Sequence, residues 1–340
     1  MKIAFINNFY NSGGGARLSY ELAKGLGMNN EMRFYGCVNG EYRSKFAKIG
    51  PAFLFPFNID LSYGNELIKE LHIFNPDIVH VFTPGKESLL FLKNLPQKAK
   101  KIVTILNDNI IGFDTSIVDQ VIFISQYQKN INKHIENSSV VRPAISFESC
   151  RSNQKEIPTF GRISPFCPTK KIQDTISCAK LINNQFCIAG EIQKSEISSN
   201  YHRGIVAYSR NANNVSITVN INENQKQYLL EKIDVLHYPT TKEAFCFSIL
   251  EGFAAKKPVL TYKNSALLEI MGDSEWACSD LSELKEKTIK MSTLSSYERQ
   301  SIGEKNHHLY NEYKTDIHQQ QIINVYKKVL TNIEAPMLNT

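Results

Sequence analysis

The sequence predicts two α/β domains, each built on a parallel β-sheet, and three observations support this fold class. The chain has 340 residues, which is more than one hydrophobic core usually supports. Short apolar runs typical of buried strands alternate with helical patterns from the N-terminus onward, as in βαβ units. The polar stretch 151–158 interrupts this alternation, which then restarts. We therefore expect a linker there between two similar domains.

The first half opens with a strand candidate at 3–6, followed by a loop over 7–15. In the next segment Leu18, Leu22 and Leu26 recur every four residues, which places them on one face of a helix. The remaining candidates of this half are strands at 53–57, 78–82, 102–106 and 121–124 and helices at 65–74 and 125–135.

The second half repeats the pattern and ends in a mostly helical segment from Asp280 onward. Its candidates are strands at 159–163, 186–189, 215–219, 235–238 and 258–262 and helices near 172–181, 224–230 and 248–255. Ligands of open parallel sheets bind beyond the carboxyl ends of the strands. Two such domains facing each other would place the active site in a cleft between them.

Composition excludes several classes of protein. Hydrophobic residues make up 42% of the chain and charged residues 21%, as in ordinary globular proteins. The seven cysteines are scattered and form no CxxC pair, which argues against a disulfide framework or a zinc site and favours a reducing cytosol. We find neither a signal-peptide pattern nor about 18 consecutive apolar residues, so we expect a cytoplasmic protein.

The net charge of +6 is modest. It suits an anionic substrate or a membrane surface, although ordinary surface charge is the simpler interpretation, and it is no signature of nucleic-acid binding. One basic cluster would suit anionic lipid but is explained equally well as a solvated surface. It consists of Lys93, Lys98, Lys100 and Lys101.

A run of three glycines, Gly13, Gly14 and Gly15, lies between the first strand and the first helix. Glycine allows a ligand to approach the main chain closely, and the helix N-terminus behind it attracts phosphate. The run matches neither the GxGxxG fingerprint nor a P-loop. By itself a tight turn explains it as well as a phosphate site does, but its position after the first strand favours a functional site.

Two carboxylates, Glu243 and Glu251, flank an apolar stretch with seven residues between them. If most of that stretch is helical, they lie about 12 Å apart, which is too far for the carboxylate pair of a glycosidase. The spacing suits contacts with two ends of one extended ligand. The alternative is a carboxylate at a helix start, Glu251, with an unrelated loop glutamate.

The segment 161–171 places Arg162, Lys170 and Lys171 in and after a strand. Cations fixed at a strand end would suit a pyrophosphate, which develops negative charge as it leaves. Basic residues in a loop are more often simply solvated.

Together these segments resemble the large family of retaining GT-B glycosyltransferases with a Glu-x7-Glu motif (glycosyl transferases group 1). The Glu243–Glu251 block followed by AKKPV is similar to the family's main signature. The other matching pieces, in the family's order, are residues 13–17 (GGGAR) with 22–23, 76–81 (PDIVHV), 161–170 (GRISPFCPTK), 186–190 (FCIAG) and 234–239 (DVLHYP).

The resemblance implies a Rossmann-like acceptor domain over residues 1–150, a donor-nucleotide domain over 158–315, and a helix at 316–335 that returns to the first domain. It implies that Arg162 and Lys170 hold the donor pyrophosphate, that Glu251 binds the ribose, and that Glu243 contacts the donor sugar. The other donor-side positions are Gly14, Gly15, Gly190, Phe247 and Ser248. Substitution of Arg162 is expected to lower turnover with little loss of folding.

By the same resemblance the donor is a nucleotide sugar, and the acceptor is a glycan or a lipid-linked molecule of surface polysaccharide or lipopolysaccharide synthesis. These enzymes usually need no bound metal or other cofactor, and no Asp-x-Asp motif to hold a metal occurs here. Peripheral contact with the inner face of the membrane is left open. No nucleic-acid partner is implied.

The sequence departs from the family in three places. Many relatives carry a histidine where this chain has Asn107 and Asp108, so we expect Asp108 to contribute to catalysis on the acceptor side, with Asn107 beside it. Cys246 replaces a glycine of the signature, and Pro165 replaces a second arginine. A further acceptor-side candidate, His80, lies at the end of a buried strand, where histidines are more often structural.

These departures leave a second function class open, a catalytically weak GT-B scaffold or partner subunit. The missing histidine and Cys246 favour it, whereas the glutamates and basic residues oppose it. A GT-B epimerase or phosphorylase is a further alternative, although no lysine motif for a pyridoxal cofactor is present.

Overall fold

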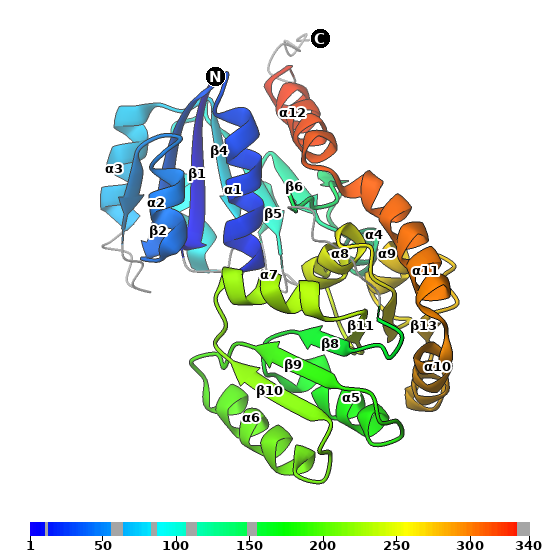
Figure 1. The fold of residues 1–340 in the computed structure, drawn as a ribbon. Coiled ribbons are helices and arrows are strands. Elements are labelled where there is room, and N and C mark those ends of the chain that lie inside the picture. The colour runs from blue at the N-terminus through cyan, green and yellow to red at the C-terminus, as the bar shows by residue number, and fades with distance from the viewer. Residues whose placement is uncertain (11–12, 56–63, 83–86, 107–113, 148–154, 332–340) are drawn as a thin grey trace. The chain divides into compact units, whose positions relative to one another are not determined.

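A computed structural model describes residues 1–10, 13–55, 64–82, 87–106, 114–147 and 155–331. The chain divides into two compact units, Met1–Ser146 with Tyr313–Thr340 and Phe147–Glu312. We call them the N-terminal and the C-terminal unit. Each contains its own parallel sheet flanked by helices (Figure 1). Two Rossmann-like sheets are what the predicted fold class requires, and this prediction is confirmed.

The N-terminal unit has a seven-stranded sheet in the order β3-β2-β1-β4-β5-β6-β7. Its strands are β1 (Lys2–Phe9), β2 (Glu31–Val38), β3 (Ala52–Leu54), β4 (Ile78–Phe82), β5 (Lys100–Ile105), β6 (Gln120–Phe123) and β7 (Ser138–Val140). Its helices are α1 (Gly14–Leu26), α2 (Glu41–Phe46), α3 (Gly64–Phe74), η1 (Glu87–Asn94), η2 (Thr115–Ile117), α4 (Gln126–Ile131) and α12 (Thr315–Thr331).

Alternation of side chains along β1 builds the two layers of this unit's core. Phe5 packs in one cluster with Leu22 of α1, and all three leucines of the predicted α1 face are buried. Ile6 packs in the other cluster with Leu71 of α3. Successive strand residues point to opposite faces of a sheet, so one strand serves both layers.

Helix α12 joins this unit from the far end of the chain. It packs beside α1 (Figure 1), and its residues Ile322 and Tyr326 belong to the same core cluster as Phe5 and Leu22. The return of a C-terminal helix to the first domain is thereby confirmed.

The C-terminal unit has a six-stranded parallel sheet in the order β10-β9-β8-β11-β12-β13. Its strands are β8 (Phe160–Ile163), β9 (Phe186–Gly190), β10 (Val215–Val219), β11 (Val235–Tyr238), β12 (Val259–Tyr262) and β13 (Ala277–Cys278). Its helices are η3 (Pro168–Lys170), α5 (Ile172–Ala179), α6 (Glu196–Ser209), α7 (Glu223–Lys232), α8 (Phe247–Ala254), α9 (Leu267–Met271), α10 (Leu281–Thr293) and α11 (Ser296–Tyr310). The short helix η4 (Asn311–Tyr313) spans the boundary between the units.

Strand β2 and helix α6 are two of the elements that the sequence did not predict. Strand β2 mixes charged residues and a glycine with its apolar ones, which hides the strand pattern. Helix α6 is mostly polar, and only Ser198 and Ile205 of its residues are buried, so it shows little helical periodicity. Both elements follow from their packing in the unit and not from a strong local signal.

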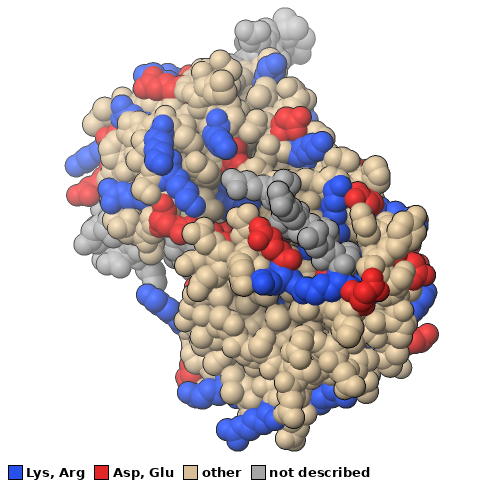
Figure 2. Space-filling model, in the orientation of Figure 1, with Lys and Arg blue, Asp and Glu red and all other residues tan. Residues whose placement is uncertain are grey.

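Basic and acidic side chains are interspersed on the face that Figure 2 shows. Some form ion pairs within one unit, such as Arg33 with Glu70 at 2.5 Å and Lys256 with Glu304 at 3.0 Å. In the part of the chain that the structure describes, none of the helices combines the length and apolarity needed to cross a bilayer.

His237 on β11 makes the stability of the C-terminal unit dependent on pH. Its ring is fully buried and contacts the hydroxyls of Thr175 and Thr288 at 3.2 and 3.0 Å. Burial, with the charge of Arg162 nearby, lowers the pKa of His237 from 6.5 to about 3. Below pH 6.5 the unfolded chain therefore takes up a proton that the folded chain does not.

We expect the free energy of unfolding to fall by about 1.4 kcal/mol for each pH unit below 6.5 through His237 alone. The effect is absent above pH 6.5 and ends near the folded pKa. Urea denaturation followed by fluorescence of Trp276, which lies in this unit, measures it. Replacing the exposed His134 should leave the slope unchanged. A stability that is constant between pH 6.5 and 5 would contradict the prediction.

Candidate active site

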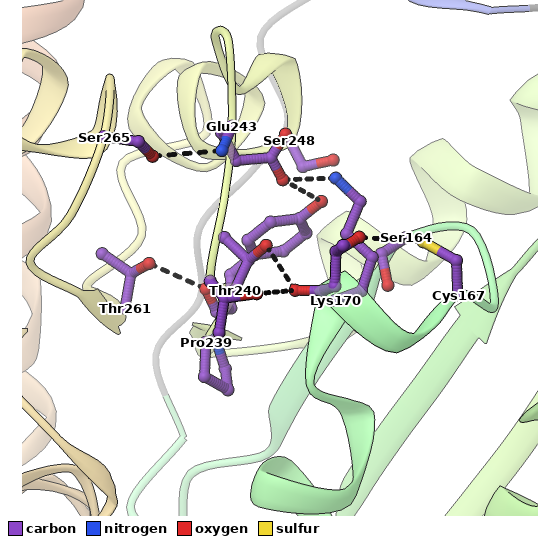
Figure 3. Close-up of polar contacts among 12 residues, drawn as sticks. Ser164, Cys167, Lys170, Pro239, Thr240, Glu243, Ser248, Thr261 and Ser265 are labelled. Carbon is purple, nitrogen blue, oxygen red and sulfur yellow. Dashed lines mark hydrogen bonds and ion pairs between the residues drawn. The ribbon is translucent and has the colours of Figure 1, made fainter. Parts of the chain in front are cut away.

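The polar residues expected from the sequence gather at the carboxyl ends of β8 and β11, which are neighbours in the sheet. Lys170 ends η3, the turn that follows β8, and Glu243 lies in the loop between β11 and α8. The Lys170 ammonium forms an ion pair with the Glu243 carboxylate, and Figure 3 shows the two side chains pointing toward one another. Their side chains are only 15% and 10% exposed.

Glu243 is held from the backbone as well as through its carboxylate. Its N–H donates to the hydroxyl of Ser265 at 3.0 Å (Figure 3). The Tyr238 hydroxyl donates to its carboxylate at 3.5 Å. Burial raises the pKa of Tyr238 well above its usual value, so this hydroxyl remains a donor.

Lys170 owes its position to a locked turn. The carbonyl of Thr169 accepts hydrogen bonds from the Thr241 N–H at 2.9 Å and the Thr240 hydroxyl at 3.0 Å. Lys171 then adopts the left-handed conformation with φ 48°, which directs the chain into α5. The turn is thus attached to the loop after β11, and Lys170 is preorganised beside Glu243.

Arg162 lies on β8, the strand before this turn, and is fully buried. Its guanidinium donates to the Ser164 hydroxyl at 3.0 Å, to the Pro239 carbonyl at 2.8 Å and to the Lys170 carbonyl. It also contacts the Thr175 hydroxyl at 3.3 Å. The guanidinium therefore joins β8, η3, α5 and the loop after β11, and it occupies a core position instead of an open pyrophosphate site.

This placement changes the expectation for Arg162. The sequence suggested that its loss would lower turnover with little loss of folding. A buried cation with several hydrogen bonds inside the unit is instead expected to contribute strongly to folding, because its removal leaves buried acceptors without donors.

Glu251 lies on α8 and is 1% exposed. It is not in the first turn of the helix, which contains no acidic residue, so the alternative of a helix-start carboxylate is wrong. Its carboxylate forms an ion pair with Lys226 of α7, with 2.5 Å between Nζ and Oε1. Each glutamate of the motif therefore has a lysine from another segment beside it.

The first turn of α8 begins with Phe247 and Ser248 after the N-cap residue Cys246. Cys246 makes no side-chain capping bond, and the Ser248 hydroxyl donates to the Ile163 carbonyl at 3.1 Å, which ties α8 to the end of β8. Cys246 has φ −139°, an extended conformation open to any residue. The replacement of the family's glycine therefore causes no backbone strain.

Gly190 ends β9 where the backbone of Ser164 passes very close. A Cβ atom at this position would lie 1.7 Å from the Ser164 carbonyl oxygen. Only glycine fits there, so close packing of two strand ends explains this residue whether or not a donor binds nearby.

In the N-terminal unit, Gly14 and Gly15 begin α1 and follow the extended Gly13. The first turn of α1 contains no acidic residue and no side-chain cap, so its N–H groups suit an anion. Asn107 and Asp108 lie outside the described residues.

His80 is also in this unit, and it is fully buried. Its ring nitrogens contact the Tyr326 hydroxyl at 2.6 Å and the Thr104 hydroxyl at 2.7 Å. Burial, with His318 nearby, lowers the pKa of His80 to about 3, so the ring is neutral. The prediction of an acceptor-side His80 is therefore replaced by the structural interpretation, because the ring links β4 and β5 to α12 inside the core.

Sequence reasoning did not single out Lys226, Tyr238 or Ser265. Lys226 reads as an ordinary solvated lysine of a polar helix, and Tyr238 as part of an apolar strand. No local pattern connects them to the glutamates, because their contacts arise from the packing of α7, β11 and the loop before α9.

Comparison with known protein families gives a match for the C-terminal half of the chain. Residues 144–308 match the family Glycosyl transferases group 1. The chain carries a group 1 glycosyl transferase domain. Both glutamates, Arg162 and Lys170 lie within it. No curated protein matches the chain.

Solved structures show the same overall fold at low sequence identity. A glycosyltransferase from Rickettsia africae has a TM-score of 0.78 and 17% identity, and the match covers 97% of this chain and 99% of that one. HepE from Anabaena, solved in complex with UDP-glucose, has a TM-score of 0.80 and 14% identity over 96% and 100% of the two chains. The lipopolysaccharide outer core galactosyltransferase WaaB has a TM-score of 0.71 and 15% identity over 96% and 100%.

Proposed function

We propose that this glycosyl transferase moves a sugar, with retention of configuration, from a nucleotide sugar to a glycan or lipid-linked acceptor. The observation that carries the proposal is the pair of preorganised Lys170 and Glu243 side chains at the carboxyl edge of the sheet, with Glu251 on the adjoining helix. Ligands of open parallel sheets bind at this edge.

Each group has a distinct task in the proposed reaction. Lys170 and the N–H groups of the first turn of α8 neutralise the charge that develops on the leaving pyrophosphate. Glu251 accepts hydrogen bonds from the ribose hydroxyls, and Glu243 contacts the donor sugar. The acceptor hydroxyl attacks the face from which the pyrophosphate leaves, and the pyrophosphate takes the hydroxyl proton. In this proposal Lys170 and the N–H groups of α8 neutralise the pyrophosphate charge, and no bound metal is needed for that task.

The structural relatives support the choice of substrates. HepE was solved with UDP-glucose, and WaaB is named for its action in the lipopolysaccharide outer core. By analogy we propose a nucleoside diphosphate sugar as donor and surface polysaccharide or lipopolysaccharide synthesis as the pathway. The enzyme would then work in the cytoplasm, at or near the inner face of the membrane.

Glu251→Gln is expected to weaken nucleotide binding by roughly 10- to 100-fold while changing the turnover of the saturated enzyme little. A charged carboxylate bonded to ribose stabilises ground and transition states alike, and such hydrogen bonds contribute about 1.5–3 kcal/mol. A thermal-shift panel of UDP, GDP and ADP first selects the nucleotide, and calorimetry then gives its Kd.

The matched control is Glu304→Gln, which removes a half-exposed carboxylate from α11 and should leave the Kd unchanged. An unaltered Kd in the Glu251→Gln protein would refute the assignment of this residue to the ribose.

A further inference from the structure

Lys226 lies between two carboxylates of the glycosyl transferase domain. Its ammonium is 2.5 Å from Oε1 of Glu251 and 3.6 Å from Oε2 of Glu223. The Glu251 side chain is 2% exposed, whereas the Glu223 side chain is 51% exposed. Lys226 itself is 19% exposed, so its charge faces the buried carboxylate more than the solvent.

The helix that carries Lys226 is capped at its N-terminus. Asn222 and Gln225 form a reciprocal capping box at the start of α7. Lys226 directly follows this box in the first turns of α7. The ion pair joins these turns to Glu251 on α8.

A buried carboxylate depends on such a partner. Transfer of a charged group out of water is costly unless it is paired and hydrogen-bonded. An ionised carboxylate in a fixed orientation accepts hydrogen bonds from hydroxyl groups about twice as strongly as a neutral acceptor. Loss of the Lys226 charge therefore removes one group that holds the Glu251 carboxylate in a fixed orientation.

We propose that Lys226 is a positioning residue for nucleotide recognition, which holds the Glu251 carboxylate in the orientation that accepts hydrogen bonds from the ribose hydroxyls of the donor. The proposal rests on the ribose-binding role of Glu251 stated above. It predicts that Lys226 affects recognition of the ribose hydroxyls and leaves the contribution of the diphosphate unchanged.

The test compares two ligands on the full-length protein. Calorimetry measures the Kd of UDP and of 2′,3′-dideoxy-UDP for the wild type and for Lys226→Met, with the matching GDP and ADP pairs run in parallel. The wild type is expected to prefer the ribonucleotide by roughly tenfold or more. In Lys226→Met this preference should fall to about twofold or less, with the affinity for the dideoxynucleotide unchanged.

Two further variants separate positioning from general damage. Lys226→Arg retains the positive charge and should restore most of the ribose preference. Lys232→Met removes a lysine from the last turn of the same helix and should preserve the full preference. If Lys226→Met does not fold, as judged by Trp276 fluorescence, Lys226→Gln replaces it in the same comparison.

Two results would overturn the proposal. One is a ribose preference in Lys226→Met equal to that of the wild type, and the other is an equal weakening of both nucleotides. A wild type that binds both nucleotides equally, or binds none of the three bases, would instead refute the proposed role of Glu251, and this inference with it.

Discussion

Replacing Lys170 with methionine is expected to lower the rate of sugar transfer by about 10- to 1,000-fold while the protein remains folded. A preorganised donor aimed at a developing negative charge typically contributes this much, because its effect is larger in the transition state than in the ground state. The turn that carries Lys170 is fixed through the backbone of Thr169, so its conformation does not depend on the ammonium group.

The measurement is kcat with saturating donor, together with the melting temperature of the variant. Lys180→Met is the matched control, since it removes an exposed lysine that directly follows α5 and should retain full activity. A Lys170→Met enzyme with near-normal kcat would show that the Lys170–Glu243 ion pair is only structural.

Replacing Arg162 with methionine is expected to destabilise the C-terminal unit by about 3–5 kcal/mol, the usual cost of removing one partner from a buried charged network. The guanidinium donates to the hydroxyl of Ser164 and to the carbonyls of Pro239 and Lys170. Methionine has no donor, so these buried acceptors would lose their partner.

Trp276 is the single tryptophan of the chain, and it is buried in the C-terminal unit. Urea denaturation followed by its fluorescence therefore reports on the unit that contains Arg162. Arg203→Met, which removes an exposed arginine from α6, should change the midpoint little. If Arg162→Met keeps its wild-type stability but loses turnover, the folding role is wrong. The result would instead support the original assignment of the guanidinium to the pyrophosphate.

One of the two arguments for a catalytically weak GT-B scaffold no longer holds. Cys246 was an argument for a weakened enzyme, because it replaces a glycine of the family signature. Its backbone is extended and accepts any residue, so this substitution does not damage the first turn of α8. Asp108, which would take the place of the missing histidine, lies outside the described residues, and its catalytic role stays a prediction.

Much of the architecture was predictable because it depends on local patterns. The spacing of Leu18, Leu22 and Leu26 fixes which face of α1 is buried, and that face is set by the helical repeat alone. Most strands of both sheets were also predictable, because a buried strand appears in the sequence as a local run of four or five apolar residues. Strand β2 was not predicted, because its polar residues and glycine interrupt the apolar pattern.

By itself, the sequence determined the two α/β units, the strand ends that carry polar loops, and the spacing of Glu243 and Glu251. Only the tertiary structure decided which residues face one another. Lys170 and Glu243 are 73 residues apart and meet because β8 and β11 are adjacent in the sheet, a strand order that no local periodicity encodes. The same packing placed Lys226 beside Glu251 and moved Arg162 and His80 into the core. Periodicity depends on the nearest few residues, whereas burial and charge pairing depend on elements brought together from distant parts of the chain.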